Sequence, residues 1–187
     1  MFGLKSLYRD LQIAVDERNW KMPFGGLRLL YNFFVTNYLL PSLAHAVPSK
    51  LTPLVHRLRG VKLGKDVFID RSVIIDEAYP QKIHIGNDVR IAAGTVLISH
   101  TKPGLHLREK YLPTRVAQVT IEDHCFIGIN VVIMPGVKLG KGCVVVSGSV
   151  VMTNVKPYSV VGGNPAKTIK MLRSLHEAEP PQSKESS

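Results

Sequence analysis

The chain has 187 residues, of which 45% are hydrophobic and two are cysteines, and its 24 Lys and Arg against 14 Asp and Glu give a formal net charge of +10. This length fits one ordinary domain with an appended segment, and the hydrophobic content excludes a disordered chain. Two cysteines are too few for a disulfide-stapled secreted scaffold, and no signal-peptide pattern begins the chain, so we expect a cytoplasmic protein. The positive charge indicates an anionic partner, but no motif points to nucleic acid.

Residues 1–59 are predicted to form short helices, because apolar residues recur there at helical spacing between prolines. Residues 1–60 hold eight Lys and Arg against three Asp and Glu, giving +5, and include a run of large apolar side chains between Leu27 and Leu39. Two interpretations stay open and are compatible. The segment caps the end of the next domain, or it makes a peripheral contact with the inner face of a membrane that contains anionic lipids.

A period of six residues replaces helical spacing from Gly60 onward. A main stripe of aliphatic residues recurs at every sixth position, except where the repeat is interrupted at about residues 77–82 and at 99–118. A second stripe of smaller residues accompanies it two places earlier. The main stripe comprises Leu63, Ile69, Ile75, Ile85, Ile91, Leu97, Ile121, Ile127, Ile133, Leu139, Val145 and Val151. No single repeat can bury its own aliphatic side chain, so the repeats must stack into a solenoid of short strands.

This period divides the chain into three parts. Residues 60–157 are expected to form the solenoid, after the helical residues 1–59. The repeat is interrupted at residues 99–118, and a break of this length inside a compact domain indicates a functional or a mobile loop. Residues 158–187 are expected to form a short helix followed by a disordered, mostly polar tail.

The solenoid resembles the hexapeptide-repeat acyltransferases over about residues 60–172, most specifically at Ile121–Gly128, Ile133–Gly140, Gly148–Val151 and Gly163–Lys167. The resemblance implies a mainly β fold, namely a left-handed parallel β-helix of hexapeptide repeats with an N-terminal helical segment and a short C-terminal helix, assembled as a homotrimer. The sequence is most similar to the branch that contains galactoside, maltose, nodulation-factor and polysaccharide O-acetyltransferases. The resemblance therefore implies acetyl-CoA as co-substrate, no metal, and a sugar or glycan as acceptor.

His100 stands at the entry to the loop 99–118. Acetyl transfer to a hydroxyl needs a base beside that hydroxyl, and histidine suits the task at neutral pH. The catalytic histidine of the related acetyltransferases occupies this place, which implies that His100 is the general base. The plain alternative is a surface histidine in a loop.

The resemblance also assigns residues to the coenzyme. Ile129 and Ser147 would line its pantetheine arm, and Lys167 and Lys170 would meet its phosphates. Relatives often carry arginine at the last two places, and lysine keeps the charge without the bidentate fork. The plain alternative is that Lys167 and Lys170 belong to a solvated face.

Three residues are candidates for the acceptor site. Phe126 stands where many sugar-acetylating relatives have Trp, and is either a wall for the sugar ring or a core residue. Asp70 lies where the galactoside and maltose enzymes carry an Asn motif, and either accepts a hydroxyl hydrogen bond or shapes a turn. His106 lies in the loop 99–118 and is a candidate for lining the acceptor pocket.

Cys125 and Cys143 are eighteen residues apart, which is three repeats, so they should stack in neighbouring coils within disulfide range. Their parallel inward side chains and the expected cytoplasmic setting favour reduced, small core residues over the alternative, a nucleophilic cysteine.

Other functions remain open beside the sugar O-acetyltransferase. An N-acetyltransferase on an amino sugar would use the same solenoid and base. A γ-class carbonic anhydrase would need a zinc ligand set, for which the spacing of His84, His100 and His106 fits poorly. A non-enzymatic scaffold of the same fold is the third alternative.

Overall fold

The computed structural model describes residues 34–35 and 39–172. The chain divides into two compact units, Met1–Val35 and Thr36–Ser187, and nearly all described residues belong to the second unit. The helices expected before residue 34 and the tail expected after residue 172 lie outside the described residues.

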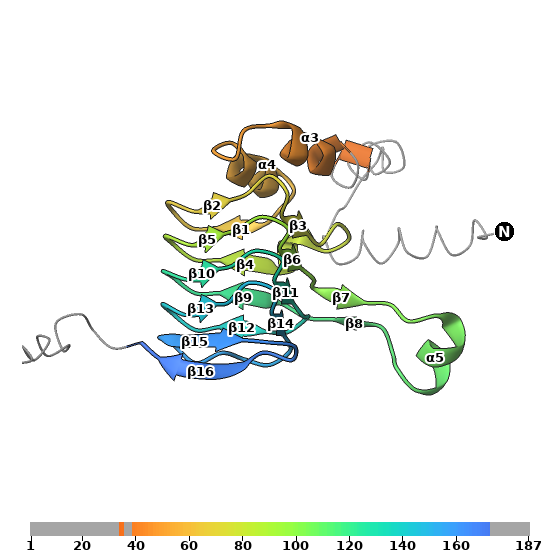
Figure 1. The fold of residues 1–187 in the computed structure, drawn as a ribbon. Helices are drawn as coiled ribbons and strands as arrows, with labels where there is room; N and C mark the ends of the chain where they lie inside the picture. Colours follow the sequence, from red (N-terminus) through yellow and green to blue (C-terminus); the bar gives the residue numbers. More distant parts are fainter. Residues whose placement is uncertain (1–33, 36–38, 173–187) are drawn as a thin grey trace, which may run out of the picture. The chain divides into compact units, whose positions relative to one another are not determined.

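Short strands wind into a left-handed β-helix with three faces (Figure 1). The first sheet contains β1 (Lys62–Leu63), β4 (Ile83–Ile85), β9 (Val119–Ile121) and β12 (Lys138–Leu139). The second sheet contains β2 (Phe68–Ile69), β5 (Arg90–Ile91), β10 (Phe126–Ile127), β13 (Val144–Val145), β15 (Ser159–Gly162) and β16 (Lys167–Met171). The third sheet contains β3 (Ile74–Ile75), β6 (Val96–Leu97), β11 (Val132–Ile133) and β14 (Val150–Val151). All pairs within these sheets are parallel except β15 with β16.

The main stripe of the sequence forms the core, which confirms the predicted period. In the second sheet Ile69 pairs with Ile91, Ile91 with Ile127, and Ile127 with Val145, and all four side chains are fully buried. A fully buried Ile or Val side chain contributes about 1.5–3 kcal/mol relative to exposure. Stacking these aliphatic side chains from coil to coil therefore stabilises a solenoid whose strands are too short to be stable alone.

The coils lie close together at the turns between the sheets. A Cβ atom on Gly128 would stand 2.6 Å from the backbone nitrogen of Ser147 in the next coil. Glycine is required there because any side chain would push the two coils apart. The glycine that follows the main stripe thus keeps the spacing of the coils.

Two short helices, α3 (Leu40–Ala46) and α4 (Thr52–Leu58), precede the first coil and cover its open end (Figure 1). The Nη2 group of Arg57 donates hydrogen bonds to the carbonyls of Leu63 and Gly64 and so ties α4 to β1. None of the helices within the described residues is long and apolar enough to span a membrane.

The loop 99–118 forms an arm. After β6 the chain forms β7 (His100–Thr101), the helix α5 (Leu105–Lys110) and β8 (Arg115–Val116), and β7 pairs with β8 in antiparallel register. The arm extends away from the β-helix, with α5 at its far end (Figure 1).

The β-helix continues beyond the expected boundary at residue 157. Strand β15 pairs in parallel with β13, and Val161 lies opposite Val145. These two valines are 161 − 145 = 16 residues apart rather than eighteen, so the last coil is two residues short and escapes a search for a strict period of six. Residues 159–162 and 167–171 form strands, not the expected helix, and any helix beyond residue 172 lies outside the described residues.

Candidate active site

His100 leaves the β-helix at the corner between the third and first sheets, where the arm begins. Its neighbour Ser99 is fully buried, and the Ser99 Oγ hydroxyl donates a hydrogen bond to the carbonyl of Tyr79, 3.1 Å away. The His100 backbone is held in β7 opposite Val116. The root of the arm is thereby fixed, and the His100 side chain, 31% exposed, stands at the surface.

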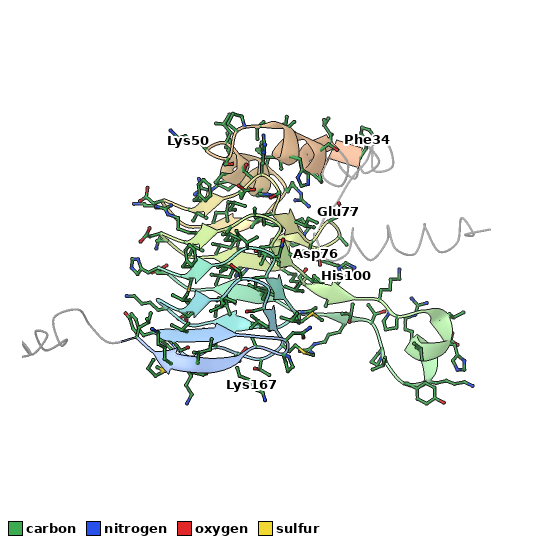
Figure 2. The ribbon with its side chains drawn as sticks, viewed as in Figure 1. Phe34, Lys50, Asp76, Glu77, His100 and Lys167 are labelled. Carbon is green, nitrogen blue, oxygen red and sulfur yellow. The ribbon has the colours of Figure 1, made fainter. Side chains whose placement is uncertain are left out.

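Asp76 lies beside His100, one coil nearer the cap (Figure 2). The Nδ1 atom of His100 is 2.6 Å from Oδ2 of Asp76, whose side chain is only 1% exposed. The ring of Tyr79 packs edge-on against the imidazole, with 5.3 Å between the ring centroids. The imidazole therefore has a carboxylate on one side and an aromatic ring on another, which fixes its orientation.

The Asp76 carboxylate is held by the backbone as well. Its Oδ1 accepts hydrogen bonds from the N–H groups of Ala78 and Tyr79, each 3.0 Å away, and its Oδ2 accepts one from the N–H of Ser99 at 2.8 Å. Burial alone would raise the pKa of Asp76. The hydrogen bonds from His100, Tyr79 and Ser99 outweigh burial and hold the pKa of this carboxyl below its ordinary value.

An ionised Asp76 determines the tautomer of His100. Because a carboxylate can only accept, Nδ1 carries the proton and donates a hydrogen bond to Asp76, which leaves the lone pair on Nε2 available. The Nε2 atom of His100 therefore has the orientation and the lone pair that a general base requires.

Arg59 connects the helical cap to this turn. Its side chain is buried, and its Nη2 group donates to the carbonyls of Ile75 (3.1 Å) and Asp76 (3.2 Å). Its Nη1 group donates to Nδ1 of His56, 3.0 Å away. Burial, together with the charge of Arg59, lowers the pKa of His56 to about 3, so that ring stays neutral and can accept.

Asp76 and Arg59 were missed by the sequence analysis. Asp76 follows Ile75, which pairs with Leu97, so it belongs to the same corner as His100. The segment between β3 and β4 contains the 3-10 turn Pro80–Lys82 and interrupts the period of six, which hides this register. Aligning Ile75 with Leu97 across the interruption would have placed Asp76 at the same corner as His100, and this alignment is the signal by which Asp76 could have been found.

Three of the four residues predicted to hold coenzyme lie at one corner, between the second and third sheets. The backbone N–H of Ile129 donates to Oγ of Ser147 at 3.0 Å, across two successive coils. Lys167 pairs with Gly162 at the start of β16, in the next coil of the same corner. Lys170 lies further along β16, opposite Val160, and both lysines are exposed.

The predicted acceptor residues are not brought together with His100 in one chain. Phe126 faces outward from the second sheet, between Arg90 and Val144. Asp70 accepts hydrogen bonds from the N–H and the hydroxyl of Ser72, and these bonds lower its pKa, as expected for the turn alternative. His106 lies in α5 against Tyr111, in the outer part of the arm.

The two cysteines stack as predicted. Cys125 and Cys143 are buried free thiols in successive coils, with 3.5 Å between their sulfur atoms. The three histidines weighed as zinc ligands lie in different elements, His84 in β4, His100 in β7 and His106 in α5. Within the described ranges no three His, Cys, Asp or Glu side chains are arranged to hold a metal ion.

Comparisons with known proteins give a consistent result. A family model that describes the hexapeptide repeat of succinyl-transferase matches residues 118–152. The Bacillus subtilis (strain 168) protein YvoF, whose name describes it as an acetyltransferase, is 31% identical over 165 residues, which are 83% of this chain and 92% of that protein.

Solved structures share the fold at low sequence identity. A hexapeptide-repeat acetyltransferase from Vibrio cholerae is 24% identical with a TM-score of 0.65, over 77% of this chain and 93% of that one. Its complex with acetyl coenzyme A gives 20% identity and a TM-score of 0.60, over 82% and 94% of the two chains. A maltose O-acetyltransferase from Clostridium difficile 630 is 23% identical with a TM-score of 0.57, over 78% and 89%.

Proposed function

Because the chain belongs to the hexapeptide-repeat acyltransferases, we propose that it transfers an acetyl group from acetyl-CoA to a hydroxyl of a sugar. The proposal rests on the dyad of His100 and Asp76, in which Nδ1 donates to a buried carboxylate and Nε2 is left as a base. One protein of the same fold is named a maltose O-acetyltransferase, which supports a sugar as acceptor. Another was solved in complex with acetyl coenzyme A, which supports acetyl-CoA as donor. The acceptor would belong to a glycan, lipopolysaccharide or capsule precursor in the cytoplasm.

The reaction is a direct transfer with both substrates bound. Nε2 of His100 takes the proton of the acceptor hydroxyl while the hydroxyl oxygen attacks the carbonyl carbon of the thioester. The tetrahedral intermediate collapses with cleavage of the carbon–sulfur bond, and the imidazolium returns the proton to the thiolate of coenzyme A. Asp76 does not touch the substrates, but it orients the ring and stabilises its charged form.

The coenzyme would lie along the corner between the second and third sheets. Ile129 and Ser147 would line the pantetheine arm there, and Lys167 would meet a phosphate, with Lys170 contributing charge further along β16. Both lysines are exposed and can turn toward an anion.

A homotrimer would complete the site. The corner that holds Ile129 and the corner that holds His100 border the same third sheet, whose outward positions are all apolar, namely Ile74, Val96, Val132 and Val150. The arm has no buried residue in α5, and it exposes Leu105, Leu107, Tyr111 and Leu112. A neighbouring subunit on this sheet would cover these side chains and bring Phe126, Asp70 or His106 of one subunit toward His100 of the other.

The test is release of free thiol from acetyl-CoA in the presence of sugars, nucleotide sugars and lipid-linked glycans. We expect thiol release with an acceptor that offers a hydroxyl, and an O-acetylated product by mass spectrometry. Products acetylated only on nitrogen would favour the amino-sugar alternative. No release with any acceptor would contradict the proposal.

A further inference from the structure

Helix α4 has its polar side against the protein and its apolar side outward. The residues buried in α4 and beside it are Thr52, Val55, His56 and Arg59. The opposite side carries Leu51, Leu54 and Leu58, which are 49%, 56% and 65% exposed. In a helix that packs on a core, leucines normally occupy the buried stripe, so three exposed leucines at spacings of three and four residues mark a face that needs a partner.

Helix α3 extends the same kind of surface. Leu39 and Leu43 are exposed at 53% and 41%, whereas Leu40 and Ala44 on the other side are buried. We use the name leucine face for Leu39, Leu43, Leu51, Leu54 and Leu58. The two helices cover the end of the β-helix, so the leucine face lies at one end of the described body (Figure 1).

The charge along this part of the sequence is of one sign. Residues 18–65 contain eight Lys and Arg and no Asp or Glu. Within the described residues Lys50, in the connection between α3 and α4, is exposed (Figure 2). Arg57 is exposed as well, although its Nη2 group binds the carbonyls of Leu63 and Gly64. A partner for this surface must combine apolar groups with negative charge.

We propose that the leucine face binds the surface of an anionic lipid membrane. The leucines would enter the acyl boundary while Lys50 meets lipid phosphates, the arrangement of an interfacial amphipathic helix. A second copy of the chain is disfavoured because it would bring two positive surfaces together. The proposed membrane surface does not depend on the proposed acetyltransferase activity. Only the corollary that the acceptor is lipid-linked depends on that activity.

The experiment measures sedimentation of the full-length protein with vesicles. One vesicle contains phosphatidylglycerol mixed with phosphatidylcholine, and the other contains phosphatidylcholine alone. We expect binding to the mixed vesicles that weakens as salt is added. The double variant Leu54→Gln, Leu58→Gln should bind about tenfold or more weakly, and Lys50→Gln about fivefold more weakly.

Ile169→Gln is the matched control, because Ile169 is 61% exposed on β16, at the other end of the β-helix. It should bind mixed vesicles as the unaltered protein does. Absence of vesicle binding by the unaltered protein, or equal binding by the double variant, would overturn the proposal. A double variant that melts many degrees lower without lipid, or changes its oligomeric state, would show that protein covers the leucines and would also overturn it.

Thiol release from acetyl-CoA with a soluble acceptor separates this proposal from the proposed function. The double variant should keep that activity while losing vesicle binding. A protein that binds vesicles but releases no thiol with any acceptor would retain the lipid surface and lose the proposed activity.

Discussion

Two corners of the β-helix each place a histidine against an aspartate, and they differ in what surrounds the carboxylate. At one corner His100 Nδ1 lies 2.6 Å from Asp76, which is 1% exposed and accepts three backbone hydrogen bonds. At another corner His124 Nδ1 lies 3.1 Å from Asp88, which is 53% exposed. Water competes for the second pair and is excluded from the first carboxylate. Pairing with an aspartate is therefore not enough to hold a histidine in the orientation of a general base; the partner carboxylate must also be buried.

Removing each histidine should give the largest contrast between the two corners. We expect His100→Ala to lower the rate of acetyl transfer about a thousandfold, since the acceptor proton then has no base. His124→Asn is the matched control and suits the left-handed backbone at that corner, where φ is 61°. It should keep the full rate in a thiol-release assay. Equal rates in the protein and in the His100→Ala variant would remove His100 from the mechanism.

Changing each aspartate tests the role of the buried carboxylate. Asp76→Asn should lower the rate about a hundredfold with little change in the KM for acetyl-CoA, because either orientation of the amide turns its NH2 toward groups that now donate to Asp76. The tautomer of His100 is then no longer fixed. Asp88→Asn should leave the rate unchanged. A rate in Asp76→Asn equal to that in Asp88→Asn would show that burial of the partner does not matter.

The sequence predicted the parts of this molecule that repeat and missed those where the repeat is broken. The period of six identified the inward residues from Ile69 to Val151, and the break after Ile98 drew attention to His100. Asp76 was missed because its partner is a coil away across an irregular segment, and the short last coil hid β15. Arg59 was missed because a helical arginine is normally solvated, and only the packing of α4 on the first coil buries it.

Arg59 offers a smaller test of how the cap supports the dyad. Arg59→Leu should lower the free energy of unfolding by about 1–3 kcal/mol, because the carbonyls of Ile75 and Asp76 lose their donors. Arg71, whose side chain is exposed, provides the same substitution at the surface, and Arg71→Leu should change stability by less than about 0.5 kcal/mol. Chemical denaturation measures both. Equal stabilities of the two variants would mean that Arg59 is not required to hold the Asp76 turn.

The smallest expected effect is the dependence of stability on acid. The pKa of Asp76 is lower in the folded protein than its ordinary value of about 3.9, so the folded state favours the ionised form. The resulting stabilisation is fully present above that ordinary pKa and is lost as the pH falls through the lower, folded pKa. Thermal unfolding below about pH 4 should therefore show a steeper loss of stability in the protein than in Asp76→Asn. Identical acid profiles for the protein and Asp76→Asn would mean that hydrogen bonding does not outweigh burial at this carboxylate, and that the two corners differ less than their geometry indicates.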